Sequence, residues 1–220
     1  MSGHESFDFA ALRPAGASCR GAQSAQLHDG GFRIADNRYD PLVGMVLNAL
    51  HRLTTQTGPF PASTAIIAVT EFGCSGHVAR VVQALSDGLR PRQAIFARAS
   101  ATMLATYPAL ALSSHGPTFA LSGGAATLRW ALALSVSLMR LKKCEAAVLV
   151  AADTLDDPAQ YQASVMRVGP NLDLVDPSSW GDGPHLDELP PSAVLAAWLD
   201  FANVTTASGN KGHTCTERSG

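Results

Sequence analysis

The chain has 220 residues, of which 46% are hydrophobic and 15% charged, so it can bury the core of one domain. A net charge of −2 and an aromatic content of 6% provide neither the basic surface nor the stacking side chains of nucleic-acid-binding proteins. No apolar stretch predicts a membrane span, and residues 1–9 lack the apolar run of a signal peptide. We therefore expect a cytoplasmic protein that binds no nucleic acid and does not span a membrane.

Composition along the chain predicts three segments. Residues 1–39 mix glycine, serine, arginine and histidine without a clear period and predict an irregular N-terminal segment. Residues 40–204 carry the periodic apolar pattern and predict one domain. Residues 205–220 are polar and predict a flexible tail.

The first part of the domain predicts alternating helices and strands. Asp40 as N-cap and Pro41 in the first turn predict the start of an amphipathic helix. The β-branched run at 64–70 predicts a buried strand, and 77–85 predicts a short helix. Residues 102–112 predict a further apolar helix. Such alternation is typical of layered α/β folds.

The second part continues this pattern. Residues 118–121 predict a short strand, and 146–151 predict a buried strand. Between them, 125–141 predicts a helix that is apolar nearly all round, as in helices buried on several sides. The acidic stretch 153–190 predicts a surface excursion, and 192–201 has strand-like composition.

Cysteine and histidine spacings indicate neither a disulfide framework nor a metal centre. The seven histidines show no HxH or HxxxH spacing. For His77 and His115, which could serve as a ligand or base, the favoured interpretation is a surface or turn histidine. No CxxC pair occurs among the four cysteines, Cys19, Cys74, Cys144 and Cys215. We therefore expect reduced thiols, no metal and no cofactor.

Four segments together resemble the N-terminal half of β-ketoacyl synthases, the condensing enzymes of the thiolase fold. They occur in the family's order and at workable spacing: TAIIAVTEFG (64–73), GPTFALSGGAATLRWAL (116–132), CEAAVLVAAD (144–153) and PPSAVLAAWLDF (190–201). The resemblance implies a thiolase-like α/β fold, layered around a buried central helix. The competing interpretation is that any α/β chain with buried strands and an alanine-rich helix would show similar segments.

The resemblance also exposes a departure from the active enzymes. In active ketosynthases a cysteine nucleophile stands at the N-terminus of the buried helix, where the helix dipole favours a thiolate. That place falls on Ala125, and neither Cys74 nor Cys144 lies on the same turn. The residues Asn210–Thr214 match the family's Asn-x-Gly-His-Thr loop, but they follow Ala125 too closely, so we interpret the match as chance. The resemblance therefore implies a subunit of the chain-length-factor type, without a catalytic residue of its own.

Such a subunit is expected to pair with an active β-ketoacyl synthase in polyketide, aryl-polyene or fatty-acid-like biosynthesis, and to meet the acyl carrier protein only indirectly. The resemblance implies that the strand before the nucleophile turn pairs with the partner, and that the preceding segment walls the partner's acyl tunnel. The residues expected at this interface and tunnel are Ile95, Phe96, Met103, Leu104, Thr118, Phe119 and Leu121. Core packing is the alternative role for each of them.

Two other functions remain open at this stage. A thiolase-fold acyltransferase or hydrolase would use Ser122 or Cys74 as its nucleophile. Ser122 does not fit the Gly-x-Ser-x-Gly pattern, because residue 120 is alanine, and a capping role at the following helix is favoured for its hydroxyl. The other alternative is a homodimeric acyl-binding or scaffold protein.

Overall fold

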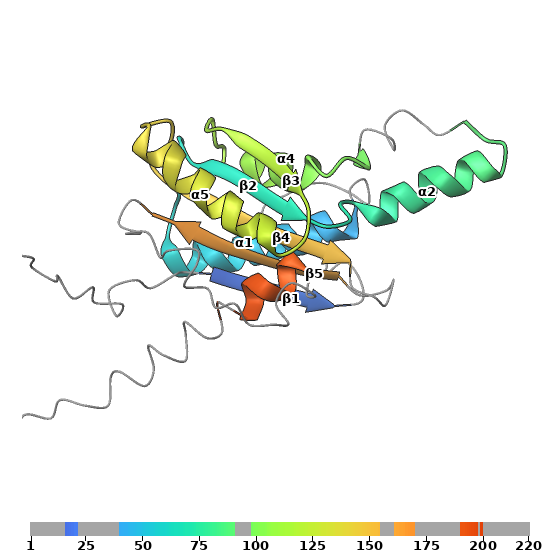
Figure 1. The fold of residues 1–220 in the computed structure, drawn as a ribbon, viewed down its shortest axis with the longest axis horizontal. Coiled ribbons are helices and arrows are strands. Elements are labelled where there is room, and N and C mark those ends of the chain that lie inside the picture. Colours follow the sequence, from blue (N-terminus) through green and yellow to red (C-terminus); the bar gives the residue numbers. More distant parts are fainter. Residues whose placement is uncertain are drawn as a thin grey trace, which may run out of the picture.

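The chain folds around a mixed five-stranded sheet (Figure 1). The computed structural model describes residues 16–21, 40–90, 98–154, 161–169, 190–197 and 199. The strands are β1 (Gly16–Gly21), β2 (Ala65–Thr70), β3 (Thr118–Ser122), β4 (Ala147–Thr154) and β5 (Tyr161–Val168). Their order is β1-β5-β4-β2-β3. Strand β2 pairs parallel with β3 and β4, whereas β5 pairs antiparallel with β4 and β1.

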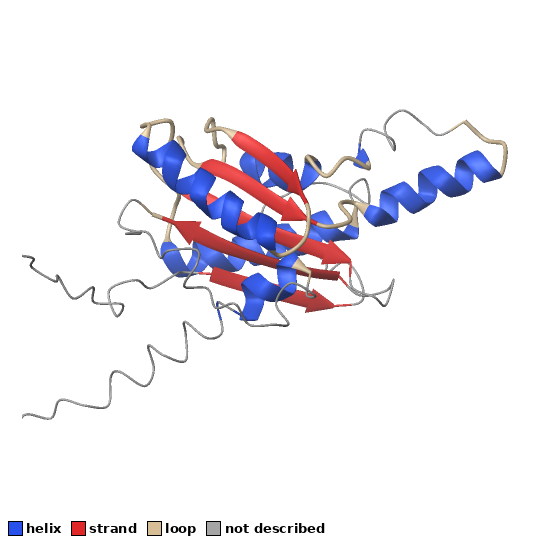
Figure 2. Cartoon of the chain, viewed as in Figure 1, coloured by secondary structure: helices blue, strands red, loops and turns tan. Residues whose placement is uncertain are grey.

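Helices cover both faces of this sheet (Figure 2). Helices α1 (Pro41–Thr57) and α4 (Met103–Ala111) share one apolar cluster with Ile66 and Ala68 of β2. Helix α5 (Ala126–Arg140) packs on the other face, against the alternate β2 residues. Because successive strand residues point to opposite faces, the uninterrupted apolar run of β2 supplies both layers. The protein is therefore a three-layer α/β/α structure.

Most of the predicted elements between residues 40 and 154 are confirmed. Asp40 caps α1 as expected, since its Oδ1 atom accepts a hydrogen bond from the Leu42 amide at 3.0 Å. The helix ends at Gly58, whose φ of +76° suits glycine. The predicted helix at 77–85 corresponds to α2 (Ser75–Ser86).

Strand β5 corrects the prediction that 153–190 is a surface excursion, because this strand lies inside the sheet between β4 and β1. Five consecutive residues, 162–166, are buried, since neighbouring strands and both helical layers surround them. The acidic residues of that segment dominate its average composition and hide the apolar strand within it. Similarly, β1 is a strand inside the segment 1–39, for which an irregular conformation was expected.

Residues 191–197 form a helix rather than the predicted strand. The carbonyl of Pro190 accepts hydrogen bonds from the amides of Ala193 and Val194 and so starts the first turn. Proline suits the first turn of a helix, and the alanines and leucine that follow favour helix. These preferences outweigh the apolar composition that resembled a strand.

Helix α5 is less buried than its composition predicts. Its inner face contacts the sheet through Leu128, Ala131 and Leu132, but Trp130 on its outer face is 74% exposed. An apolar helix surface thus faces solvent in this chain.

Several predictions lie outside the described residues. They concern Ile95, Phe96, the tail 205–220 and Asn210–Thr214. Within the described part of the chain, no helix combines the length and hydropathy needed to cross a bilayer.

Candidate functional site

The strands β2, β3 and β4 are parallel, so their C-terminal ends lie together on one side of the sheet, where α/β folds usually bind ligands. We call this side the C-terminal edge, as distinct from the outer strand β3. Three sequence-predicted features meet this edge. Cys74 follows β2, Ser122 ends β3, and Ala125 precedes α5. We therefore consider this edge as the candidate functional site.

The buried carboxylate of Asp153 holds this edge together. Its Oδ1 atom accepts hydrogen bonds from Thr70 Oγ1 at 3.2 Å and from the Glu71 amide at 2.7 Å. Its Oδ2 atom accepts one from the amide of Ser192 at 2.9 Å. Thr70 Oγ1 in turn accepts from the Gly73 amide. One side chain thus joins the ends of β4 and β2 to the helix at 191–197.

Ala125 occupies the position where helix α5 begins. Its backbone is already helical, at φ −51° and ψ −38°, and its methyl group is buried. The preceding turn is fixed by a hydrogen bond from the Gly123 amide to the Thr70 carbonyl at 3.0 Å. Gly123 has a φ of +154°, and a Cβ there would overlap Thr127 Oγ1. The structure thus forms a tight strand-to-helix turn and places a methyl group at its helical end.

Ser122 does not cap α5 as expected. Its side chain is exposed, and its hydroxyl makes no hydrogen bond to another described residue. No histidine or carboxylate of the described chain is hydrogen-bonded to this hydroxyl, as a base that activates a serine nucleophile would be.

Cys74 stands at the N-terminus of α2 but is buried, with its Sγ atom 3.5 Å from the Ser100 carbonyl oxygen. Burial, with a smaller contribution from the Asp40 carboxylate, raises the pKa of this thiol to about 12. A helix N-terminus alone would lower a thiol pKa, so desolvation dominates here. Cys74 is therefore protonated at neutral pH and is a poor nucleophile.

His77 forms a buried pair with Asp40, which corrects its interpretation as a surface or turn histidine. Asp40 Oδ2 accepts a hydrogen bond from the His77 amide at 2.8 Å and lies 3.1 Å from His77 Nδ1. Both side chains are almost fully buried. The same carboxylate that caps α1 thus also fixes the first turn of α2.

The remaining predicted site residues separate into edge and core positions. Strand β3 lies at the edge of the described sheet, and Phe119 on it is 37% exposed. Leu121 packs against the core cluster of α5. Leu104 is fully buried in the cluster of α1 and α4, whereas Met103 is half-buried against it. The fit of Leu104 with the core favours a packing role for that residue.

Sequence reasoning missed the role of Asp153 and the pairing of Asp40 with His77. An acidic residue directly after the apolar run of β4 was the available signal for Asp153. Nothing in the spacing of Asp40 and His77 indicates their contact, because it depends on how α1 and α2 meet. Among the described residues, no group of three histidine, cysteine or carboxylate side chains could hold a metal ion.

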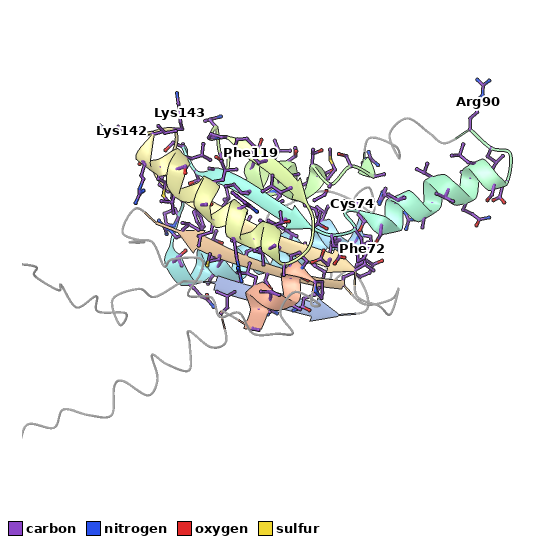
Figure 3. The ribbon with its side chains drawn as sticks, in the orientation of Figure 1. Phe72, Cys74, Arg90, Phe119, Lys142 and Lys143 are labelled. Carbon is purple, nitrogen blue, oxygen red and sulfur yellow. The ribbon has the colours of Figure 1, made fainter. Side chains whose placement is uncertain are left out.

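A groove of about 690 Å³ lies at the opposite edge of the sheet, beside the start of β4. Arg167 is fixed in its wall, where its guanidinium lies 4.8 Å from the centre of the Phe60 ring and donates to the Thr57 carbonyl. Lys142 and Lys143 also line this groove (Figure 3). It lies away from Ala125 and Cys74, so it is separate from the candidate site.

Replacing Asp153 with alanine is expected to lower the free energy of unfolding by about 3 kcal/mol, because two buried donors and one partly buried donor lose their acceptor. Denaturant unfolding followed by circular dichroism measures this loss. Asp153→Asn, which keeps one acceptor oxygen, should lose less. Asp87→Ala, which removes an exposed carboxylate, is the matched control and should change stability by under about 0.5 kcal/mol. Equal unfolding midpoints for Asp153→Ala and the wild type would contradict this role.

Cys74 is expected to resist alkylation by iodoacetamide at pH 8 in the folded protein, because its raised pKa leaves almost no thiolate. Peptide mass spectrometry measures the labelled fraction, and the urea-unfolded protein provides the control. Since the folded-state pKa is raised from 9.0 to about 12, this group also makes the folded state less stable as the pH rises above about 9. Rapid labelling of Cys74 in the folded protein would refute the assignment.

No protein-family model matches the sequence, and no curated protein sequence is significantly similar to it. Solved structures do match the fold. The ishigamide ketosynthase/chain length factor matches with a TM-score of 0.54 and 16% identity, over 63% of this chain and 46% of that chain.

A β-ketoacyl synthase from Burkholderia phymatum STM815 matches with a TM-score of 0.54 and 11% identity, over 73% of this chain and 53% of that chain. The chain thus spans about half the length of each of these structures. At these identities the likeness establishes the fold alone. The protein has the thiolase-like α/β fold of the β-ketoacyl synthases, as the sequence resemblance implied.

Proposed function

We propose that this chain is a non-catalytic subunit of the chain-length-factor type, which pairs with an active β-ketoacyl synthase and shapes its acyl tunnel. The observation that carries this proposal is Ala125 at the start of α5. A methyl group cannot accept an acyl chain from a thioester. The tight turn before Ala125 is formed, and the end of β2 beside it is fixed by hydrogen bonds to Asp153. The chain therefore has the strand-to-helix turn but no nucleophilic side chain at residue 125.

The nearby nucleophilic side chains support the same conclusion. The thiol of Cys74 is buried and protonated, and Ser122 has no base hydrogen-bonded to it among the described residues. These observations disfavour an acyltransferase or hydrolase that uses either residue.

The exposed edge of β3 supports pairing with a second chain. The Pro117 carbonyl accepts from the Ile66 amide, and the Gly123 amide donates to the Thr70 carbonyl. Because alternate residues of a strand bond to the same neighbour, the amides of residues 118, 120 and 122 point away from β2. Since no other strand of the described sheet pairs with this side of β3, it can pair with a partner strand.

Met103 is the described residue that best fits a tunnel-lining role. It lies at the start of α4, a helix that contacts β3, and it is half-buried rather than enclosed by the core. The acyl carrier protein would then contact the active partner. A cytoplasmic heterodimer in polyketide, aryl-polyene or fatty-acid-like biosynthesis is the setting that we infer.

Co-expression with the ketosynthase encoded nearest to this chain tests the proposal. Co-purification followed by light scattering should give a one-to-one complex. Ala120→Pro removes an outward amide of β3 without breaking its bonds to β2, and should weaken the complex at least about tenfold. Ala120→Val keeps the amide and is the matched control.

Two outcomes would contradict different parts of the proposal. A wild-type chain that never binds the ketosynthase would overturn the subunit role. A folded Ala120→Pro variant that binds as tightly as Ala120→Val would overturn pairing through the β3 edge.

A further inference from the structure

The groove beside the start of β4 is lined by three positively charged side chains that come from both faces of the sheet. Arg167 belongs to β5 and lies on the face covered by α1, because its guanidinium reaches Phe60 and the Thr57 carbonyl. Lys142 and Lys143 follow α5, which covers the other face. The groove thus collects cations from two layers at one end of the sheet.

These charges are not neutralised within the part of the chain that the structure describes. None of the three cations forms an ion pair with a described residue. Glu145 is the acidic side chain that lines the groove, and its Oε1 atom accepts a hydrogen bond from Ser63 Oγ at 2.8 Å. Three cations and one carboxylate leave the groove with a formal charge of +2.

The guanidinium of Arg167 is held in the groove wall by two contacts. It stacks on the Phe60 ring, and one of its N–H groups donates to the Thr57 carbonyl at 3.1 Å. A guanidinium has five such donors in a planar fork that matches phosphate oxygens, so the others remain for a ligand. Because the side chain is already fixed, ligand binding costs little of its conformational entropy.

Lys142 occupies a backbone position that normally belongs to glycine. Its φ is +54°, and its amide donates to the Met139 carbonyl while the Lys143 amide donates to the Leu138 carbonyl. These two bonds form a Schellman cap at the end of α5, in which the left-handed residue is most often glycine. A lysine at this place costs stability, so its side chain points to a use beyond ending the helix.

We propose that this groove binds a phosphate monoester whose organic part is apolar or aromatic and about as large as a nucleoside. A phosphate monoester carries a charge close to −2 at neutral pH, which matches the +2 of the groove. Pro61, Met139 and Ala146 provide apolar wall for the organic part. The volume of about 690 Å³ is that of small-molecule sites. This inference does not depend on the proposed function.

Isothermal titration calorimetry of the full chain with adenosine 5′-monophosphate tests the proposal. Inorganic phosphate and adenosine serve as partial ligands, and each should bind at least about fivefold more weakly than the monophosphate. Absence of heat from the monophosphate at millimolar concentration would overturn the inference. Adenosine that binds as tightly would exclude a role for the cations, and phosphate that binds as tightly would exclude a role for the apolar wall.

Two charge variants in the groove should shift the affinity in opposite directions. Lys143→Gln should weaken monophosphate binding at least about fivefold, because it removes a charge-assisted contact. Glu145→Gln should strengthen binding at least about twofold, because it removes a like charge. Both side chains are exposed, so the fold should survive both changes.

Arg90→Gln is the matched control. It removes the same charge as Lys143→Gln, but Arg90 is exposed beyond the far end of α2, the helix that projects from the body (Figures 1 and 3). The affinity should stay at the wild-type value. Equal weakening in Arg90→Gln and Lys143→Gln would show a general attraction to positive charge and would overturn the site.

Lys142→Gly separates ligand binding from the structural role of the helix end. Glycine suits the left-handed backbone, so the urea midpoint of unfolding should rise. Monophosphate binding should nevertheless weaken at least about fivefold. A variant that is more stable and binds the monophosphate as tightly as the wild type would contradict the role of Lys142 in the site.

Discussion

The candidate site depends on the hydrogen bonds that the buried carboxylate of Asp153 accepts. The carboxylate satisfies donors from three separate parts of the chain, the end of β2, the turn that follows it and the helix at 191–197. A buried carboxylate is costly unless such partners surround it, so the segments it joins are held together as a unit. The Thr70 carbonyl in turn anchors the Gly123 amide, which connects this network to the turn before Ala125.

The edge at which the parallel strands end combines a tight strand-to-helix turn with side chains that are poor nucleophiles. The tight turn and the helix start are present at Ala125, but the side chain there is a methyl group. Cys74 occupies another helix start at this edge, yet its burial beside Asp40 favours the neutral thiol. The described residues at this edge thus form a strand-to-helix turn without an activated nucleophile, which supports the non-catalytic role proposed above. Among the described strands, β3 has a neighbour on one side only, so its other side is an edge that can pair with a partner strand.

The sequence predicted the α/β class and most elements because their signals are local. The Asp40 cap, the apolar run of β2 and the turn before α5 each depend on neighbouring residues. Strand β5 was missed because its burial comes from β4 and β1 on either side, and the helix at 191–197 because its apolar composition suits a strand as well. The pairing of Asp40 with His77 and the exposure of α2 depend on tertiary arrangement, which periodicity does not encode.

Intact-mass spectrometry of the co-purified complex, after exposure to a reactive acyl-thioester analogue, shows which of the two chains carries the nucleophile. We expect an acyl adduct on the ketosynthase and none on this chain, because Ala125 offers no nucleophile and the Cys74 thiol is protonated. A stoichiometric adduct on this chain, mapped to Ser122 or Cys74, would instead establish an enzyme with its own nucleophile and rule out the non-catalytic role.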